Sequence, residues 1–176
     1  MRSLMLSTTV FMLGLLTGCA APQMGPGATM VTEDALQPHT YDYTISSAAK
    51  DVLFQRARDY FATSFGDSRS VIRVQDANEG LILGKGATSW NIETGMTFAP
   101  ITTCYSEYDV RFMAKDGKAR LQVEVIRGAP SYSVCSGWAL PTITGYQKIL
   151  EGFNTFSKSL GVALEGKGRS EEFRNF

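Results

Sequence analysis

Residues 105–127 read YSEYDVRFMAKDGKARLQVEVIR and carry the strongest structural signal in the chain. The pair Asp116-Gly117 is typical of a two-residue turn between antiparallel strands. With the turn placed there, apolar side chains oppose one another: Phe112 faces Leu121, Val110 faces Val123 and Tyr108 faces Val125. Because a shift of one residue would destroy this agreement, the pattern predicts a hairpin with one buried face and a fixed register.

Segments on both sides of this hairpin show the periodicities of further strands and helices. These patterns predict strands at 41–45, 70–75 and 81–92, and helices at about 46–66 and 144–161. We expect Ser46 or Ser47 to cap the first helix. Thr144, with Gln147 three residues later, has the spacing of a capping box for the second helix.

The expected elements follow the order β-α-β-β-β-β-α. Each helix has one apolar stripe that must be buried, and two helices are enough to cover one face of five strands. The sequence therefore predicts an α+β two-layer sandwich, with an antiparallel five-stranded sheet, two helices on one face and the other face open. We expect this domain at 41–164, followed by a charged, frayed tail at 165–176.

Three segments of this domain resemble a family of uncharacterised bacterial proteins: 71–76 (VIRVQD), 80–86 (GLILGKG) and 115–120 (KDGKAR). The stretch from about 43 to 127 is similar to that family, which is described as a domain of unknown function with a TATA-box-binding-protein-like fold. The resemblance implies the same fold for this chain. It supplies no catalytic residues, and the DNA-binding name reflects shape alone.

The first eighteen residues have the layout of a lipoprotein signal peptide. Arg2 is followed by an apolar run at 9–16 that is too short to span a bilayer as a helix. Leu16-Thr17-Gly18-Cys19 then resembles the bacterial lipobox, in which the cysteine is acylated and becomes the first residue of the mature protein. The resemblance implies that Cys19 is lipidated. Ala20 after it favours the outer membrane, with the domain facing the periplasm.

Residues 19–40 contain three prolines, including Pro38, and two glycines, and they show no hydrophobic period. This composition predicts a flexible tether with a reach of about 25 Å. We expect His39 to be a solvated residue of that tether.

Composition excludes several classes of function. Seventeen basic residues balance seventeen acidic ones, whereas a protein held by nucleic-acid phosphates normally carries a basic excess. One histidine cannot build a His-rich metal site, and no loop has the alternating acids of an EF-hand. The segment 80–86 lacks the glycine spacing and the hydroxyl of a phosphate-binding loop. We therefore expect no metal, no cofactor and no nucleic-acid partner.

Acidic residues and cysteines are the remaining candidates for chemistry. Glu107, Asp109 and Glu124 share the outer face of the hairpin and could form an acid–base pair, although a solvated, charge-balanced face is favoured. Cys104 and Cys135 predict a disulfide, because the signal peptide places the domain in an oxidising compartment.

Large apolar residues also occur in the segment 131–140, which has no strand or helix period. Tyr132 and Trp138 either form an exposed contact there or cover the sheet edge. Since Tyr and Trp most often anchor interfaces, we predict that this loop belongs to a partner-binding surface.

These observations predict a lipid-anchored cell-envelope protein that is not an enzyme but a binding or assembly module. Its membrane contact would be the N-terminal lipid, and its partner an envelope protein or a cell-wall component. Two alternatives stay open: a pure spacer, and an envelope hydrolase or lyase that uses the carboxylates on the sheet face.

The lipobox predicts a clear effect of Cys19→Ser. Without the thiol there is no acyl acceptor, so the variant should be left uncleaved or soluble and should not carry the mass of the lipid. Detergent phase partition and intact mass measure both properties against the parent protein. Full partition into detergent with the parental mass would show that Cys19 is not the anchor.

Overall fold

The computed structural model describes residues 29–64, 72–92 and 101–167. The elements are η1 (Glu33–Ala35), β1 (His39–Thr44), α1 (Lys50–Ser64), β2 (Ile72–Asp76), β3 (Leu81–Ile92), β4 (Thr102–Lys115), β5 (Lys118–Val125) and α3 (Ile143–Leu164). The expected signal peptide, Cys19 and most of the expected tail lie outside the described residues. None of the helices described is both long enough and apolar enough to cross a membrane.

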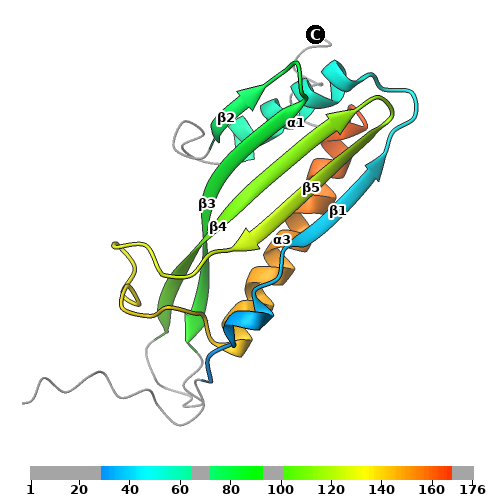
Figure 1. Cartoon of the computed structure of the whole chain (residues 1–176). Helices are drawn as coiled ribbons and strands as arrows, with labels where there is room; N and C mark the ends of the chain where they lie inside the picture. The colour runs from blue at the N-terminus through cyan, green and yellow to red at the C-terminus, as the bar shows by residue number, and fades with distance from the viewer. Residues whose placement is uncertain (1–28, 65–71, 93–100, 168–176) are drawn as a thin grey trace, which may run out of the picture.

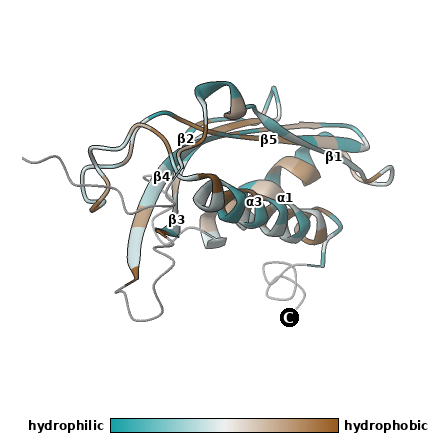
Figure 2. Cartoon of the chain, turned by 90° about the horizontal axis from the view of Figure 1, so that it is seen from below, coloured by the Kyte–Doolittle hydropathy of each residue, from teal (hydrophilic) through white to brown (hydrophobic). Residues whose placement is uncertain are grey.

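The five strands form one antiparallel sheet in the order β1-β5-β4-β3-β2. Strands β2 to β5 follow one another as a meander, and β1 adds to the free edge of β5. Helices α1 and α3 lie on the same side of the sheet, and the described residues form no layer on the opposite side (Figures 1 and 2). The predicted α+β two-layer sandwich is confirmed.

The predicted register of the central hairpin is also confirmed. Phe112 lies opposite Leu121, Val110 opposite Val123 and Tyr108 opposite Val125. Gly117 adopts a φ of 73°, which the two-residue turn requires and which glycine reaches without strain. Residues of β4 and β5 alternate between buried and accessible along this pairing, so one face is core and the other meets solvent.

Aromatic contacts join the two helices to the buried face. Phe61 of α1 meets Phe112 of β4 edge-on at 5.9 Å between ring centroids, and it stacks on Phe156 of α3 at 5.7 Å. Phe153 of α3 meets Tyr108 of β4 at 5.0 Å. Burial raises the pKa of the Tyr108 hydroxyl to about 12, because the phenolate would lose its hydration there. One aromatic layer therefore holds the sheet to both helices.

Both helices begin at residues other than those expected. The Oδ1 atom of Asp116, in the hairpin turn, accepts the backbone N–H of Lys50 at 2.8 Å, so α1 is capped from a distant part of the chain. Helix α3 is capped by Thr142, whose side chain accepts the N–H of Gly145, and not by Thr144. The cap of α1 differs from the expected one because the start of this helix contacts the hairpin turn. The cap of α3 differs because this helix begins at Ile143, so that Thr142 and not Thr144 is the residue that precedes it.

The expected tether is wrong for residues 29–40, which pack on the domain. Val31 is buried, and its N–H donates to Pro141 O at 3.0 Å. His39 begins β1, and its Nε2 is hydrogen-bonded to the hydroxyl of Tyr146 at 3.1 Å. The same hydroxyl donates to Ala35 O. These backbone and tyrosine contacts to α3 and the loop before it hold residues 29–40 against the domain.

The capping contact predicts that Asp116→Ala destabilises the domain. The variant removes the acceptor for the Lys50 N–H and a side chain that favours the turn, and we expect the free energy of unfolding to fall by about 1 kcal/mol. Asp116→Asn keeps both properties and is the matched control. Urea unfolding of the three proteins measures the difference, and equal stability of the Ala and Asn variants would contradict the cap.

Candidate functional site

The end of the sheet where β3 ends and β4 begins is joined to the loop between β5 and α3 by a disulfide. Cys104 and Cys135 are bonded, their Cα atoms are 5.4 Å apart, and both residues are buried. The predicted pairing of these cysteines is present. The bond attaches the middle of the loop to the first residues of β4.

Hydrogen bonds within the loop fix its path further. Gly128 N–H donates to Ala139 O at 2.8 Å and closes the base of the loop. The hydroxyl of Ser133 is buried and accepts the N–H groups of Tyr105 and Cys135 at 3.1 and 3.2 Å. With the disulfide, these bonds hold the loop against the first residues of β4.

The two aromatic residues predicted as contacts have different positions. Trp138 is half-buried and packs on Trp90 at 6.0 Å between ring centroids. Trp90 is buried, donates to the Ser106 hydroxyl at 3.0 Å, and lies so close to Gly145 that a Cβ there would come within 2.4 Å of its ring. Trp138 thus covers the core, which is the alternative that the sequence left open.

Tyr132, by contrast, is 66% exposed. Its ring lies edge-on against Tyr105 at 5.4 Å, so it is supported from below and open to solvent above. Val134 in the same loop is 75% exposed. The loop therefore presents apolar groups outward at an end that its disulfide makes rigid.

Two exposed isoleucines lie at the same end of the domain. Ile101 directly precedes β4 and is 76% exposed, and Ile143, the first residue of α3, is 45% exposed. We call Ile101, Tyr132, Val134 and Ile143 the apolar tip. Figure 2 shows hydrophobic segments in the loop and at the adjacent strand end. Neither isoleucine is predicted from the sequence, because the stretch before β4 shows no period and the capping-box pattern at Thr144 places the start of α3 after Ile143.

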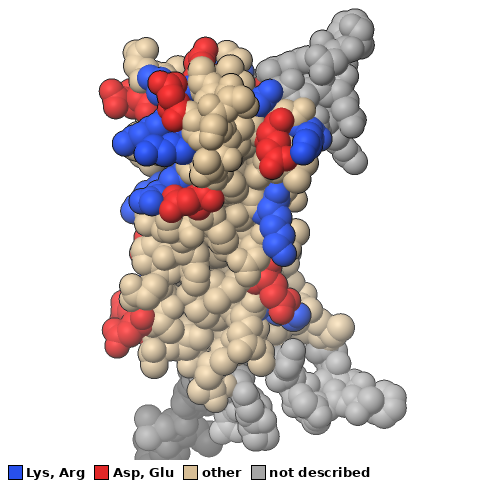
Figure 3. All heavy atoms as spheres, turned by 90° about the vertical axis from the view of Figure 1, so that its right-hand side faces the viewer, with Lys and Arg blue, Asp and Glu red and all other residues tan. Residues whose placement is uncertain are grey.

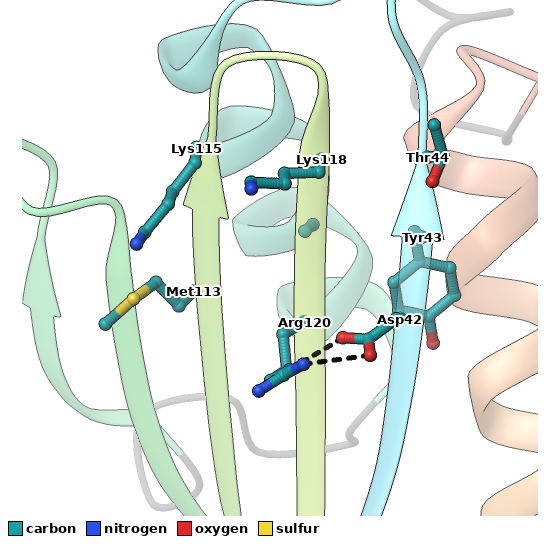
Figure 4. A pocket seen from close by; sticks show the side chains of 8 residues that line it. Asp42, Tyr43, Thr44, Met113, Lys115, Lys118 and Arg120 are labelled. Carbon is teal, nitrogen blue, oxygen red and sulfur yellow. Dashed lines mark hydrogen bonds and ion pairs between the residues drawn. The ribbon is translucent and has the colours of Figure 1, made fainter.

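The open face of the sheet is polar and carries paired charges. Asp42 accepts two hydrogen bonds from Arg120, at 2.6 and 2.9 Å, and this contact lowers the pKa of Asp42 and raises that of Arg120. This pair lines a surface hollow of about 410 Å³ together with Lys115 and Lys118. Figure 4 shows these side chains. The hollow is a solvated surface depression with an excess of basic side chains.

The three acids considered for catalysis are brought together on this face. Asp109 lies directly opposite Glu124, as expected from the register. Glu107 is 3.9 Å from Lys85, and Glu124 is 3.9 Å from Arg111. These acids do not line the hollow, and all sit on an open surface beside cations. Within the described residues, no group of His, Cys, Asp and Glu side chains is arranged to hold a metal ion.

The sheet order and the helices on one face define an α+β domain with a TBP-like fold. Residues 40–128 match the family model of a domain of unknown function (DUF4468) with TBP-like fold, which covers half of the chain. The chain belongs to this family. The match ends before the loop that carries Tyr132.

Two solved structures are similar to this chain. The chain is similar to a DUF4468 family protein from Bacteroides ovatus, with 13% identity and a TM-score of 0.53 over 79% of this chain and 91% of that one. It is also similar to a TBP-like protein from Parabacteroides distasonis, with 12% identity and a TM-score of 0.48 over 70% and 91%. No curated protein matches the chain. At these identities the first likeness shows the fold alone.

The different burial of the two aromatics predicts different costs of substitution. Trp138→Ala removes a ring that packs on Trp90 and should lower the free energy of unfolding by about 2 kcal/mol. Tyr132→Ala removes an exposed ring with one aromatic neighbour and should cost less than about 1 kcal/mol. Thermal unfolding of the oxidised proteins measures both. A larger loss for Tyr132→Ala than for Trp138→Ala would contradict the positions described.

Proposed function

We propose that this protein is a lipid-anchored cell-envelope protein that works by binding and not by catalysis. Acylated Cys19 attaches it to the bacterial outer membrane, with the domain in the periplasm. The domain is a binding or assembly module, and its contact surface is the apolar tip. This surface meets another component of the envelope.

One observation carries the proposal: Tyr132 and Val134 are exposed on a loop that a buried disulfide attaches to the sheet. Exposed apolar side chains stabilise a complex by leaving water when a partner covers them. Because the loop is already ordered, little conformational entropy is lost on binding. Tyrosine is also among the residues that most often dominate binding energy at interfaces.

The open sheet face supports binding over the hydrolase or lyase alternative. A general acid or base usually sits where burial or a like charge moves its pKa towards neutrality. Glu107 and Glu124 are partly exposed and each has a cation at 3.9 Å, Lys85 and Arg111 respectively, so the charge of Asp109 opposite Glu124 is balanced on this face. A face with paired charges of both signs keeps the domain soluble at the membrane surface.

Hydroxyl-radical footprinting of intact envelopes tests the proposal. Tyr132 should be oxidised several-fold more slowly in the envelope than in the purified protein, because a bound component covers the tip. Met113, which is exposed on the open face near the opposite end, is the internal control and should be oxidised at the same rate in both. Equal oxidation of Tyr132 in the two samples would contradict a contact at the tip.

A further inference from the structure

The first residues that the structure describes, from Thr29 onward, lie beside the apolar tip. Thr29 O accepts the N–H of Ile143 at 2.9 Å, and Met30 forms an isolated antiparallel bridge with Thr142. The N-terminal segment therefore joins the domain at the beginning of α3. In Figure 1 this is the end at which β3, β4 and the disulfide-bonded loop also meet.

The distance along the chain to the expected anchor is short. Cys19 precedes Thr29 by ten residues, which span at most about 35 Å in any conformation. Helix α3 has 22 residues and is therefore about 33 Å long, so the hairpin turn lies roughly one helix length beyond the tip. A bilayer that holds the lipid of Cys19 is thus always within reach of the tip.

The two ends of the domain differ in chemistry. The tip exposes Ile101, Tyr132, Val134 and Ile143, and tyrosine is a residue that favours the boundary between lipid and water. The nearby Arg127 and Glu33 form an ion pair at 3.3 Å. At the other end lie the exposed Lys115 and Lys118, whose charges favour water over a hydrocarbon layer. In Figure 3, which views the domain from the right-hand side of Figure 1, most of the charged side chains lie in the upper half.

We propose that the apolar tip rests on the bilayer in which the protein's own lipid is anchored. The domain then stands upright, with the hairpin turn and the basic hollow directed away from the membrane. This inference rests on the proposed function for its lipid anchor and its contact surface, and it names the lipid surface as the component that the tip meets. A few apolar side chains are enough to hold the domain in this orientation, because the lipid anchor already keeps it at the membrane.

Depth-dependent fluorescence quenching tests this orientation. The acylated protein is reconstituted into vesicles of phosphatidylethanolamine and phosphatidylglycerol that contain brominated lipids. Tyr132→Trp adds an emitter at the tip, and Met113→Trp adds one on the open face as the matched control. The emission of each variant is read after subtraction of the parent protein, whose Trp90 and Trp138 pack against one another.

We expect brominated lipids to quench the tryptophan at position 132 several-fold more strongly than the one at position 113. Equal quenching at the two positions, or none at position 132, would overturn the inference. If Tyr132→Trp does not fold with its disulfide and melting temperature intact, Val134→Trp replaces it with the same expectation.

The failure of this inference can be separated from failure of the proposed function. If Tyr132 is protected from oxidation in intact envelopes but position 132 is unquenched in vesicles of lipid alone, the bilayer is not the contact. The proposed function would then stand with a protein or wall component at the tip. If Tyr132 is fully oxidised in intact envelopes, the proposed function itself fails.

Discussion

The single register of β4 with β5 is the constraint on which the rest of this structure depends. Because side chains alternate along a strand, this register sends Val110 and Phe112 towards the helices and Arg111 towards solvent. It also sends Cys104 into the core at the far end of β4. The open polar face and the disulfide-bonded end both follow from one pairing that begins at Gly117.

The disulfide extends the influence of that register to the end of the domain that carries the apolar tip. The bond joins Cys104 and Cys135, which are 31 positions apart in the sequence, and on a chain-entropy estimate it contributes roughly 3–4 kcal/mol to stability. It holds a loop that turns Trp138 onto Trp90 and leaves Tyr132 in solvent. A surface that is both apolar and rigid results, and this combination suits binding better than either property alone.

The features that the sequence could predict are those fixed by local pattern. Strand alternation and the Asp-Gly turn were sufficient for the hairpin, and two cysteines in the domain were sufficient for the disulfide. Contacts between distant residues decided the rest. Composition could not show that His39 would meet Tyr146, that Asp116 would cap α1, or that Trp138 would be covered. Each of these contacts joins residues that are 48 to 107 positions apart in the sequence, from the Trp90–Trp138 pair to the His39–Tyr146 pair.

The proposed contact between the domain and the envelope involves the apolar tip and not the open face of the sheet. Photo-crosslinking in living cells tests this most directly, with a benzophenone amino acid placed at Tyr132 or at Gln122 on the open face. We expect adducts with a lipid or an envelope component from position 132, and none above background from position 122. Adducts from position 122 alone would contradict it.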